Sequence, residues 1–272
     1  MISRLRQLRD VYAAKLRAEI AIQFAYRGAI LIWLIGLVLQ PVVYLVVWTT
    51  VAASTGAGGV AGYRAADFAA YFAILMVVNQ LTFTWHFGFF QWRVQHGYFS
   101  PLLLRPVHPI HNDVAENLTF KLLTLTVVLP TAALLLVAFD AAFAPSPWQV
   151  LAFVPALLLA MTLRFIVEWT LALAAFWVTR VMAINDAYFV LTLFLSGQIA
   201  PLDLLPGPVQ AVATALPFRW MVAFPVELLI GRLQPQDALV GLAVQAAWIG
   251  VGAIVLRVAW NAGIRRYSAV GA

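Results

Sequence analysis

The chain has 272 residues, of which 64% are hydrophobic and only 10% charged, and its formal net charge is +6. Soluble domains carry about 25% charged residues, so this composition excludes an ordinary soluble protein and predicts an all-α membrane protein. The sequence contains no cysteine, which excludes disulfides, thiolate metal sites and cysteine nucleophiles.

The first segment, residues 1–26, combines apolar and basic residues at helical spacing. Apolar side chains recur every three or four positions from Leu5 to Phe24, and arginines and a lysine stand between them. This pattern predicts an amphipathic helix lying in the membrane interface. A short cytosolic helix packed on a partner is the alternative, and both interpretations place the segment at the cytoplasmic face.

Residues 27–261 contain apolar runs long enough to cross the hydrocarbon layer, which takes about 20 residues of helix. We expect six spans, over residues 28–47, 68–91, 118–139, 148–179, 181–200 and 238–256. The first should kink at Gln40 and Pro41, and Lys121 in the third should snorkel to the interface. The fourth run exceeds the membrane thickness, so it must tilt, bend or protrude.

Two irregular segments interrupt the spans. Residues 91–112 are rich in histidine, arginine and proline, which predicts a structured loop outside the lipid. Residues 201–235 are broken repeatedly by proline, and their two apolar pieces, 209–216 and 218–230, are too short to cross comfortably. We interpret these pieces as re-entrant half-helices.

The orientation follows from the distribution of lysine and arginine, which favour the cytoplasmic side of short loops. With six spans and both termini cytoplasmic, the basic residues gather inside, including those of the tail over residues 262–272. Only Arg64, Arg219 and Arg232 fall in the outer segments. A seventh span at residues 218–230 would place the basic tail outside, so six spans are favoured.

No catalytic motif is present, and we expect no enzymatic activity and no catalytic residue. A P-loop has the pattern G-x-x-x-x-G-K-[ST], but the lysines of this chain, Lys15 and Lys121, follow Ala14 and Phe120. Energy from a nucleotide must therefore come from another chain.

Histidines do not form a recognisable metal motif either. His96, His108 and His111 lie in a proline-broken loop without an H-E-x-x-H helix, so we expect no metal site there. A polar loop that meets lipid headgroups or a protein partner is the simpler interpretation. His86 falls within a span, where a hydrogen-bonded interior histidine is expected.

Several polar residues are expected inside the membrane. Arg164 and Glu168 lie one helical turn apart and should form an ion pair. The amides Gln40, Asn79, Gln80 and Gln198 either join helices by hydrogen bonds or face a substrate path.

Three segments, together with the order of the parts, resemble a known family. They are GYFSPLLLRP at residues 97–106, LPFRWMVAFPVELLIGR at 216–232 and RRYSAVGA at 265–272. In these segments and in its plan, the chain is similar to type-2 ATP-binding-cassette (ABC) exporter permeases of the bacterial six-span subgroup.

The resemblance implies a permease subunit that moves substrate by alternating closure in the bacterial inner membrane. It also implies a second permease, identical or homologous, and two copies of a cytosolic ABC ATPase subunit. That partner holds ATP and Mg, so no cofactor is expected on this chain. Membrane lipids are expected partners and nucleic acid is not. The alternatives are a secondary transporter or channel that needs no ATPase and a non-transporting scaffold.

The resemblance also implies roles for residues. A coupling helix that contacts the ATPase would include Gln91, Arg93, Gly97, Phe99, Leu102, Leu103, Leu104 and Arg105. An outer gate or pathway would include Ser196, Gly197, Gln198 and Pro201, with Gln40, Asn79 and Gln80. The amino-terminal helix would connect laterally to the ATPase, and the re-entrant segment would cap the pathway.

Overall fold

The computed structural model describes residues 2–25, 27–55 and 59–267, so the end of the predicted tail, residues 268–272, lies outside the described part of the chain. Helices make up the fold in these ranges. They are α1 (Ile2–Ala25), α2 (Arg27–Ser54), α3 (Ala65–Thr82), α4 (His86–Gln95), α5 (Ser100–Leu103), α6 (Ile110–Ala138), α7 (Pro147–Ala172), η1 (Leu173–Phe176), α8 (Met182–Leu195), η2 (Leu202–Leu204), α9 (Gly207–Ala215), α10 (Phe218–Met221), α11 (Ala223–Leu229) and α12 (Pro235–Arg266).

Six apolar segments correspond to the six predicted spans. Within the described residues, four are long and apolar enough to cross a membrane: Ala65–Gln95, Ile110–Ala138, Pro147–Phe176 and Pro235–Arg266. Two shorter apolar segments, Val38–Ser54 and Met182–Leu195, account for the first and fifth spans. The predicted all-α membrane fold is confirmed.

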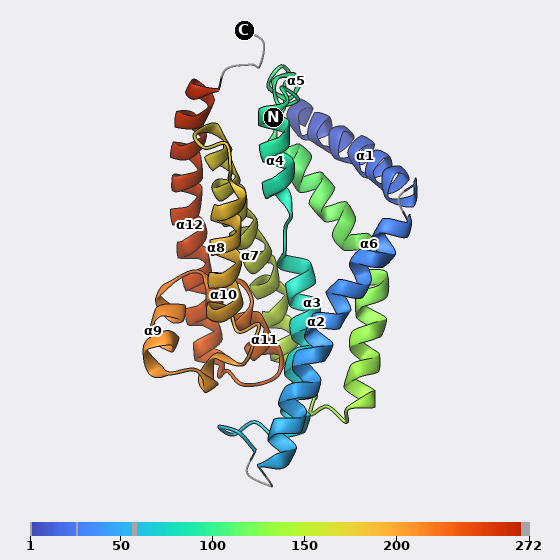
Figure 1. Cartoon of the computed structure of the whole chain (residues 1–272), viewed down its shortest axis with the longest axis vertical. Helices are drawn as coiled ribbons and strands as arrows, with labels where there is room; N and C mark the ends of the chain where they lie inside the picture. The colour runs from blue at the N-terminus through green and yellow to red at the C-terminus, as the bar shows by residue number, and fades with distance from the viewer. Residues whose placement is uncertain (1, 26, 56–58, 268–272) are drawn as a thin grey trace.

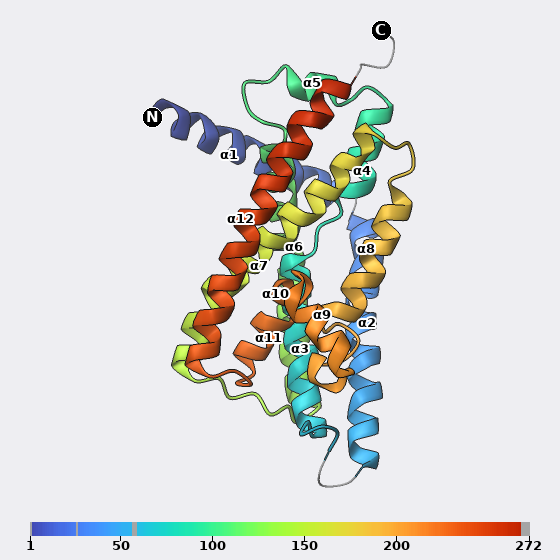
Figure 2. The same cartoon turned by 90° about the vertical axis from the view of Figure 1, so that its left-hand side faces the viewer.

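The helices run between two distinct ends of an elongated bundle (Figures 1 and 2). At one end lie α5, the last turns of α12 and the start of α1, and at the other lie the connections from α2 to α3 and from α6 to α7. The short helices α9, α10 and α11 occupy the half of the bundle nearer the second end. The first and last described segments thus share one end, as an even number of crossings requires.

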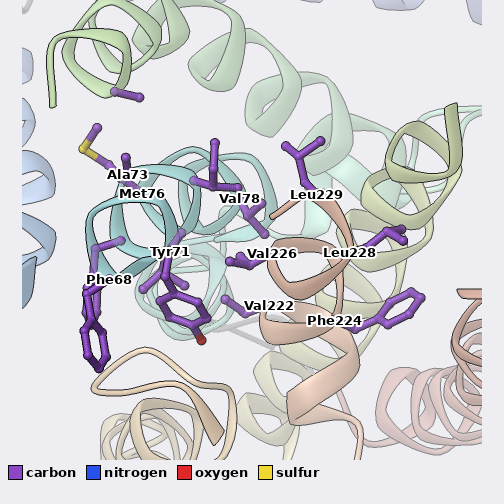
Figure 3. Close-up of a cluster of buried hydrophobic side chains, with 14 of the residues drawn as sticks. Phe68, Tyr71, Ala73, Met76, Val78, Val222, Phe224, Val226, Leu228 and Leu229 are labelled. Carbon is purple, nitrogen blue, oxygen red and sulfur yellow. The ribbon is translucent and has the colours of Figure 1, made fainter. Parts of the chain in front are cut away.

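Helix α3 forms the centre of the bundle and packs against α2, α6, α7 and α11. In Figure 3, Tyr71 and Val78 of α3 lie beside Val222, Val226 and Leu229 of the segment that includes α11. Lipid is as apolar as these side chains, so the packing rests on close contact rather than on transfer out of water.

Three of the spans, α3, α7 and α12, begin with side-chain caps at the end opposite α5. The backbone N–H of Arg64 donates to Asp67 Oδ2 at 2.8 Å before α3, and that of Gln234 donates to Asp237 Oδ2 at 3.1 Å before α12. Pro235 occupies the first position of α12, where its missing N–H costs nothing. Local sequence therefore determines where these helices start.

Several predicted boundaries require correction. The second span is broken between α3 and α4, and α6 begins at Ile110, well before residue 118. The fifth span ends early, because the chain turns at Gly197, whose φ of +81° belongs to the left-handed region. The half-helix predicted over residues 218–230 is divided at Val222, where the backbone leaves the helical conformation.

Candidate functional site

The break in the second span is the central feature of the membrane interior. A broken helix leaves backbone groups that must find partners, because lipid offers none. Lys121 of α6 donates its Nζ hydrogens to the Phe83 carbonyl at 2.9 Å and to Asn117 Oδ1. Glu168 Oε2 of α7 accepts the backbone N–H of Thr84 at 3.0 Å and the Thr84 hydroxyl. Charged side chains thus replace the missing helical hydrogen bonds.

This arrangement corrects the expectation for Lys121. The side chain does not snorkel to the interface, since the residue is only 3% exposed. The free carbonyl at the break gives the ammonium group a partner inside the bundle, which the apolar run in the sequence did not reveal.

Arg164 and Glu168 form an ion pair within α7, with Nε and Oε1 2.7 Å apart, and both residues are 2% exposed. Arg164 Nη1 also donates to Asn79 Oδ1 at 2.8 Å and to Thr82 Oγ1 at 3.0 Å, at the end of α3. The hydroxyl of Tyr188 in α8 donates to Glu168 Oε1 at 3.1 Å. The pair therefore joins three spans at the level of the break.

A cavity of about 440 Å³ lies beside this network, between α2, α3, α7 and α8. Its walls include Arg164 and the four amides that the sequence indicated, which are Gln40, Asn79, Gln80 and Gln198. Aromatic and aliphatic side chains, among them Tyr44, Leu75, Phe83 and Phe189, complete the walls. Amides spread over three separate sequence regions are brought to one site.

The other predicted gate residues lie near this cavity but do not line it. Ser196, Gly197 and Pro201 are buried in the turn that follows α8. The Gly197 carbonyl accepts a hydrogen bond from the Tyr71 hydroxyl at 2.8 Å, and Trp48 Nε1 donates to the Ile199 carbonyl at 2.8 Å. These bonds fix the turn to α3 and α2.

The segment predicted to be a coupling helix lies at the end of the bundle where α12 ends (Figure 2). It begins at Gln91 within α4 and continues through a turn at Gly97, with φ of +75°, into the short helix α5. Gln91 Nε2 donates to the Thr179 carbonyl at 2.9 Å, and Arg93 Nη1 donates to Asp113 Oδ1 at 2.8 Å. Gln91 and Arg93 therefore fix the segment to the loop after η1 and to helix α6.

Phe99 also requires a correction. The sequence placed it among residues that contact a partner, but its side chain is 0% exposed. It packs against Phe90, Phe176, Trp260 and Tyr267, with ring centroids 5.0 to 6.1 Å apart. An aromatic ring is buried more favourably against other rings than left in water, so Phe99 anchors the segment instead.

The outward surface of the segment consists of different side chains. Leu104 is 88% exposed and Arg105 is also exposed, whereas Leu102 and Leu103 pack partly against the core. The exposed ring of Tyr98 stacks on Trp92 with centroids 4.6 Å apart. The sequence did not predict Trp92 and Tyr98 as contact residues. Aromatic residues in a polar loop could have indicated them, because such residues are enriched at protein interfaces.

One histidine and two acids lie close together in the first turns of α4 and α6. His86, Asp113 and Glu116 offer ligand atoms within 4.8 Å of one another. However, Asp113 already accepts hydrogen bonds from Arg93 and from Trp169 Nε1 at 2.9 Å. The Arg93 guanidinium supplies the positive charge that this buried carboxylate needs.

The three loop histidines are directed to separate partners. His111 bonds the Tyr12 hydroxyl at 3.0 Å and ties α1 to α6, and His96 Nδ1 pairs with the Trp92 carbonyl at 3.0 Å. His108 packs on Trp260, with ring centroids 4.3 Å apart.

Sequence reasoning missed Thr84, Thr124 and Tyr188 as members of the buried network. Thr124 accepts a hydrogen bond from Gln80 Nε2, and the other two bind Glu168. Threonine occurs throughout membrane helices, so nothing in the sequence distinguished Thr84 and Thr124. Tyr188 meets Glu168 only through the packing of α8 on α7.

Comparison with known proteins identifies one family. The sequence model described as ABC-2 family transporter protein matches residues 38–271. No curated protein and no solved structure matches the chain.

Proposed function

We propose, since this chain belongs to the ABC-2 family of transporter proteins, that it is the non-catalytic permease subunit of an ATP-driven exporter. The observation that carries this proposal is the exposed surface at the end of α5, formed by the two residues that follow it, Leu104 and Arg105. Leu104 projects from a polar segment beyond the spans, and Phe99 beneath it fixes the segment to the bundle. An exposed apolar side chain on a rigid support is suited to a pocket on a protein partner.

The partner we propose is a cytosolic ABC ATPase subunit, present in two copies, which binds ATP and Mg. A second permease, identical or homologous, completes the transporter. The end of the bundle that holds α5 then faces the cytoplasm, together with both termini, and the protein resides in the bacterial inner membrane. Leu104 and Arg105, with Gly97 shaping the turn, form the contact.

The break between α3 and α4 suggests how motion at α5 reaches the membrane interior. Helix α4 joins α5 to the break, and the Phe83 carbonyl there binds Lys121 while Phe83 itself lines the cavity. A shift of α4 would act on the cavity wall without bending an intact helix. Two packings that differ by only a few kcal/mol would suffice for nucleotide binding to shift the population between them.

Two further segments receive supporting roles in this proposal. Helix α1 rests at the membrane surface and reaches the ATPase, held to α6 by the bond between Tyr12 and His111. The segment from α9 to α11 caps the pathway at the opposite end. Arg219 Nη2 contacts Glu227 Oε2 at 2.8 Å within it and keeps its short helices together.

A secondary transporter remains the competing class, because it too can contain buried charges. In this structure the buried charged residues stabilise the backbone and the helix ends, which explains their presence without an ion-transport role. Glu168 and Lys121 close the backbone at the break, and Arg164 holds the end of α3.

The experiment is copurification from native membranes. Tagged protein should retain, in near-stoichiometric amount, a soluble chain whose sequence contains a P-loop, and Leu104→Asp or Arg105→Glu should abolish the retention. Arg64→Glu is the matched control, since Arg64 is an exposed arginine at the opposite end of the bundle. It should leave retention unchanged.

The proposal fails if no P-loop ATPase is retained by the wild-type protein, or if the Leu104 and Arg105 variants retain it as well as the control does. Transport by the purified chain alone in proteoliposomes, driven by an ion gradient, would support the competing class instead.

A further inference from the structure

The cavity beside the break has features of a binding site for a small molecule. Its volume of about 440 Å³ falls within the range of roughly 300 to 1,000 Å³ that is typical of such sites. Apolar walls surround a few polar groups, which is the composition that binds an amphiphile and fixes its orientation.

The ionisable residues at this level are unbalanced. Two basic residues, Arg164 and Lys121, accompany one acidic residue, Glu168, at this level, and all three are 2–3% exposed. Arg164 is the charged residue among the cavity walls. Its ion-pair partner Glu168 does not line the cavity and also accepts hydrogen bonds from Thr84 and Tyr188. Because Glu168 is shared among Arg164, Thr84 and Tyr188, an anion in the cavity would give the guanidinium a second acceptor and would be stabilised there.

Amide geometry adds a hydrogen-bond donor. Asn79 Oδ1 accepts from Arg164 Nη1 at 2.8 Å, which fixes which side of the amide carries the NH₂ group. Asn79 Nδ2 has no hydrogen-bond partner among the described residues, and Asn79 lines the cavity. The guanidinium and this NH₂ group together provide donors next to each other.

We propose that this cavity binds amphiphiles whose polar end is anionic, such as a phosphate monoester or a carboxylate, and that such molecules are the transported substrates. The negative end lies against Arg164 and Asn79, and the apolar part lies against Tyr44, Leu75 and Phe189. The assignment as substrate rests on the proposed transport function, whereas the binding itself does not.

The first test compares headgroups on one apolar chain. Purified full-length protein in phosphatidylcholine nanodiscs is titrated with dodecyl phosphate, dodecyl maltoside and dodecyltrimethylammonium, and empty nanodiscs provide the baseline. We expect dodecyl phosphate to bind with a Kd at least about tenfold lower than the other two, which corresponds to about 1.4 kcal/mol. Equal affinities for the three headgroups would overturn the proposal.

The second test locates the site with Gly36→Phe. Gly36 lines the cavity, and a Cβ added there meets nothing within 4 Å, so the ring can enter the open space without displacing a neighbour. Gly250→Phe on α12 is the matched control, because its surroundings are also open but it does not line the cavity. Dodecyl phosphate binding should weaken at least about tenfold in Gly36→Phe and stay unchanged in the control. Unchanged binding in Gly36→Phe would overturn the assignment to this cavity.

A third arm separates a transported molecule from a bilayer lipid with the same chemistry. Phosphatidylglycerol is added to the nanodiscs, and the Kd for dodecyl phosphate should not change. Competition by phosphatidylglycerol would overturn the substrate assignment and make the ligand a lipid headgroup. No ATPase takes part in these titrations, so a failure of the partner proposal and a failure of this one give different results.

Discussion

Removal of the Glu168 carboxylate tests whether the buried network holds the broken span together. In Glu168→Ala, Arg164 loses its counterion and the Thr84 amide and the Tyr188 hydroxyl lose their acceptors. Breaking a buried ion pair by removing one partner costs about 3 to 5 kcal/mol. Each orphaned polar group adds roughly 1 to 3 kcal/mol, although some will find new partners. We expect a total loss of about 5 kcal/mol in the free energy of unfolding.

A double substitution separates the ion pair from the other bonds. In Arg164→Met with Glu168→Leu, neither buried charge remains, and apolar side chains of similar size fill the space. Neighbouring residues in one network couple by about 0.5 to 3 kcal/mol. The double variant should therefore lose at least about 2 kcal/mol less than the sum of the losses in Arg164→Met and Glu168→Leu measured singly.

The assay is reversible unfolding in mixed micelles with increasing SDS, followed by far-UV circular dichroism. Asp186→Ala is the matched control, because Asp186 is an exposed acid on α8, and it should remain within about 0.5 kcal/mol of wild type. The reasoning is refuted if Glu168→Ala also stays within about 1 kcal/mol of wild type, or if the single losses simply add in the double variant.

Two further predictions concern α12 and the loop before α6. Gly241→Val should lower the free energy of unfolding by about 1 to 3 kcal/mol in the same assay, because the added Cβ would overlap the Phe224 ring. Gly250→Val is the control, since the added side chain enters open space and should change the stability little. Equal losses in the two variants would contradict this packing. The pKa of His108 is lowered because part of its ring is buried beside Trp260. The folded state therefore binds the proton less tightly than the unfolded state does. As a result, the protein loses stability as the pH falls below about 6.5. Between pH 7.5 and 5.5, Tm should therefore fall further in wild type than in His108→Phe, and equal falls in the two proteins would refute this role for His108.

The sequence alone predicted the membrane fold and the six apolar segments. Hydrophobic length decides this question locally, because each helix must satisfy its own backbone hydrogen bonds in lipid. An even number of spans also predicts that the two ends of the chain lie at the same end of the bundle, as the described residues do. The ion pair of Arg164 and Glu168 was also accessible, since a separation of one helical turn brings two side chains together without help from any other element.

Contacts between distant elements could not be read in this way. The break before Trp85 contains neither proline nor glycine, and it persists because Lys121 and Glu168 arrive from two other helices to bind its backbone. Phe99 looked like part of a contact surface until its neighbours from η1 and α12 covered it. Composition and spacing determined what enters the membrane, whereas the rotation and packing of whole helices decided which polar groups meet inside it.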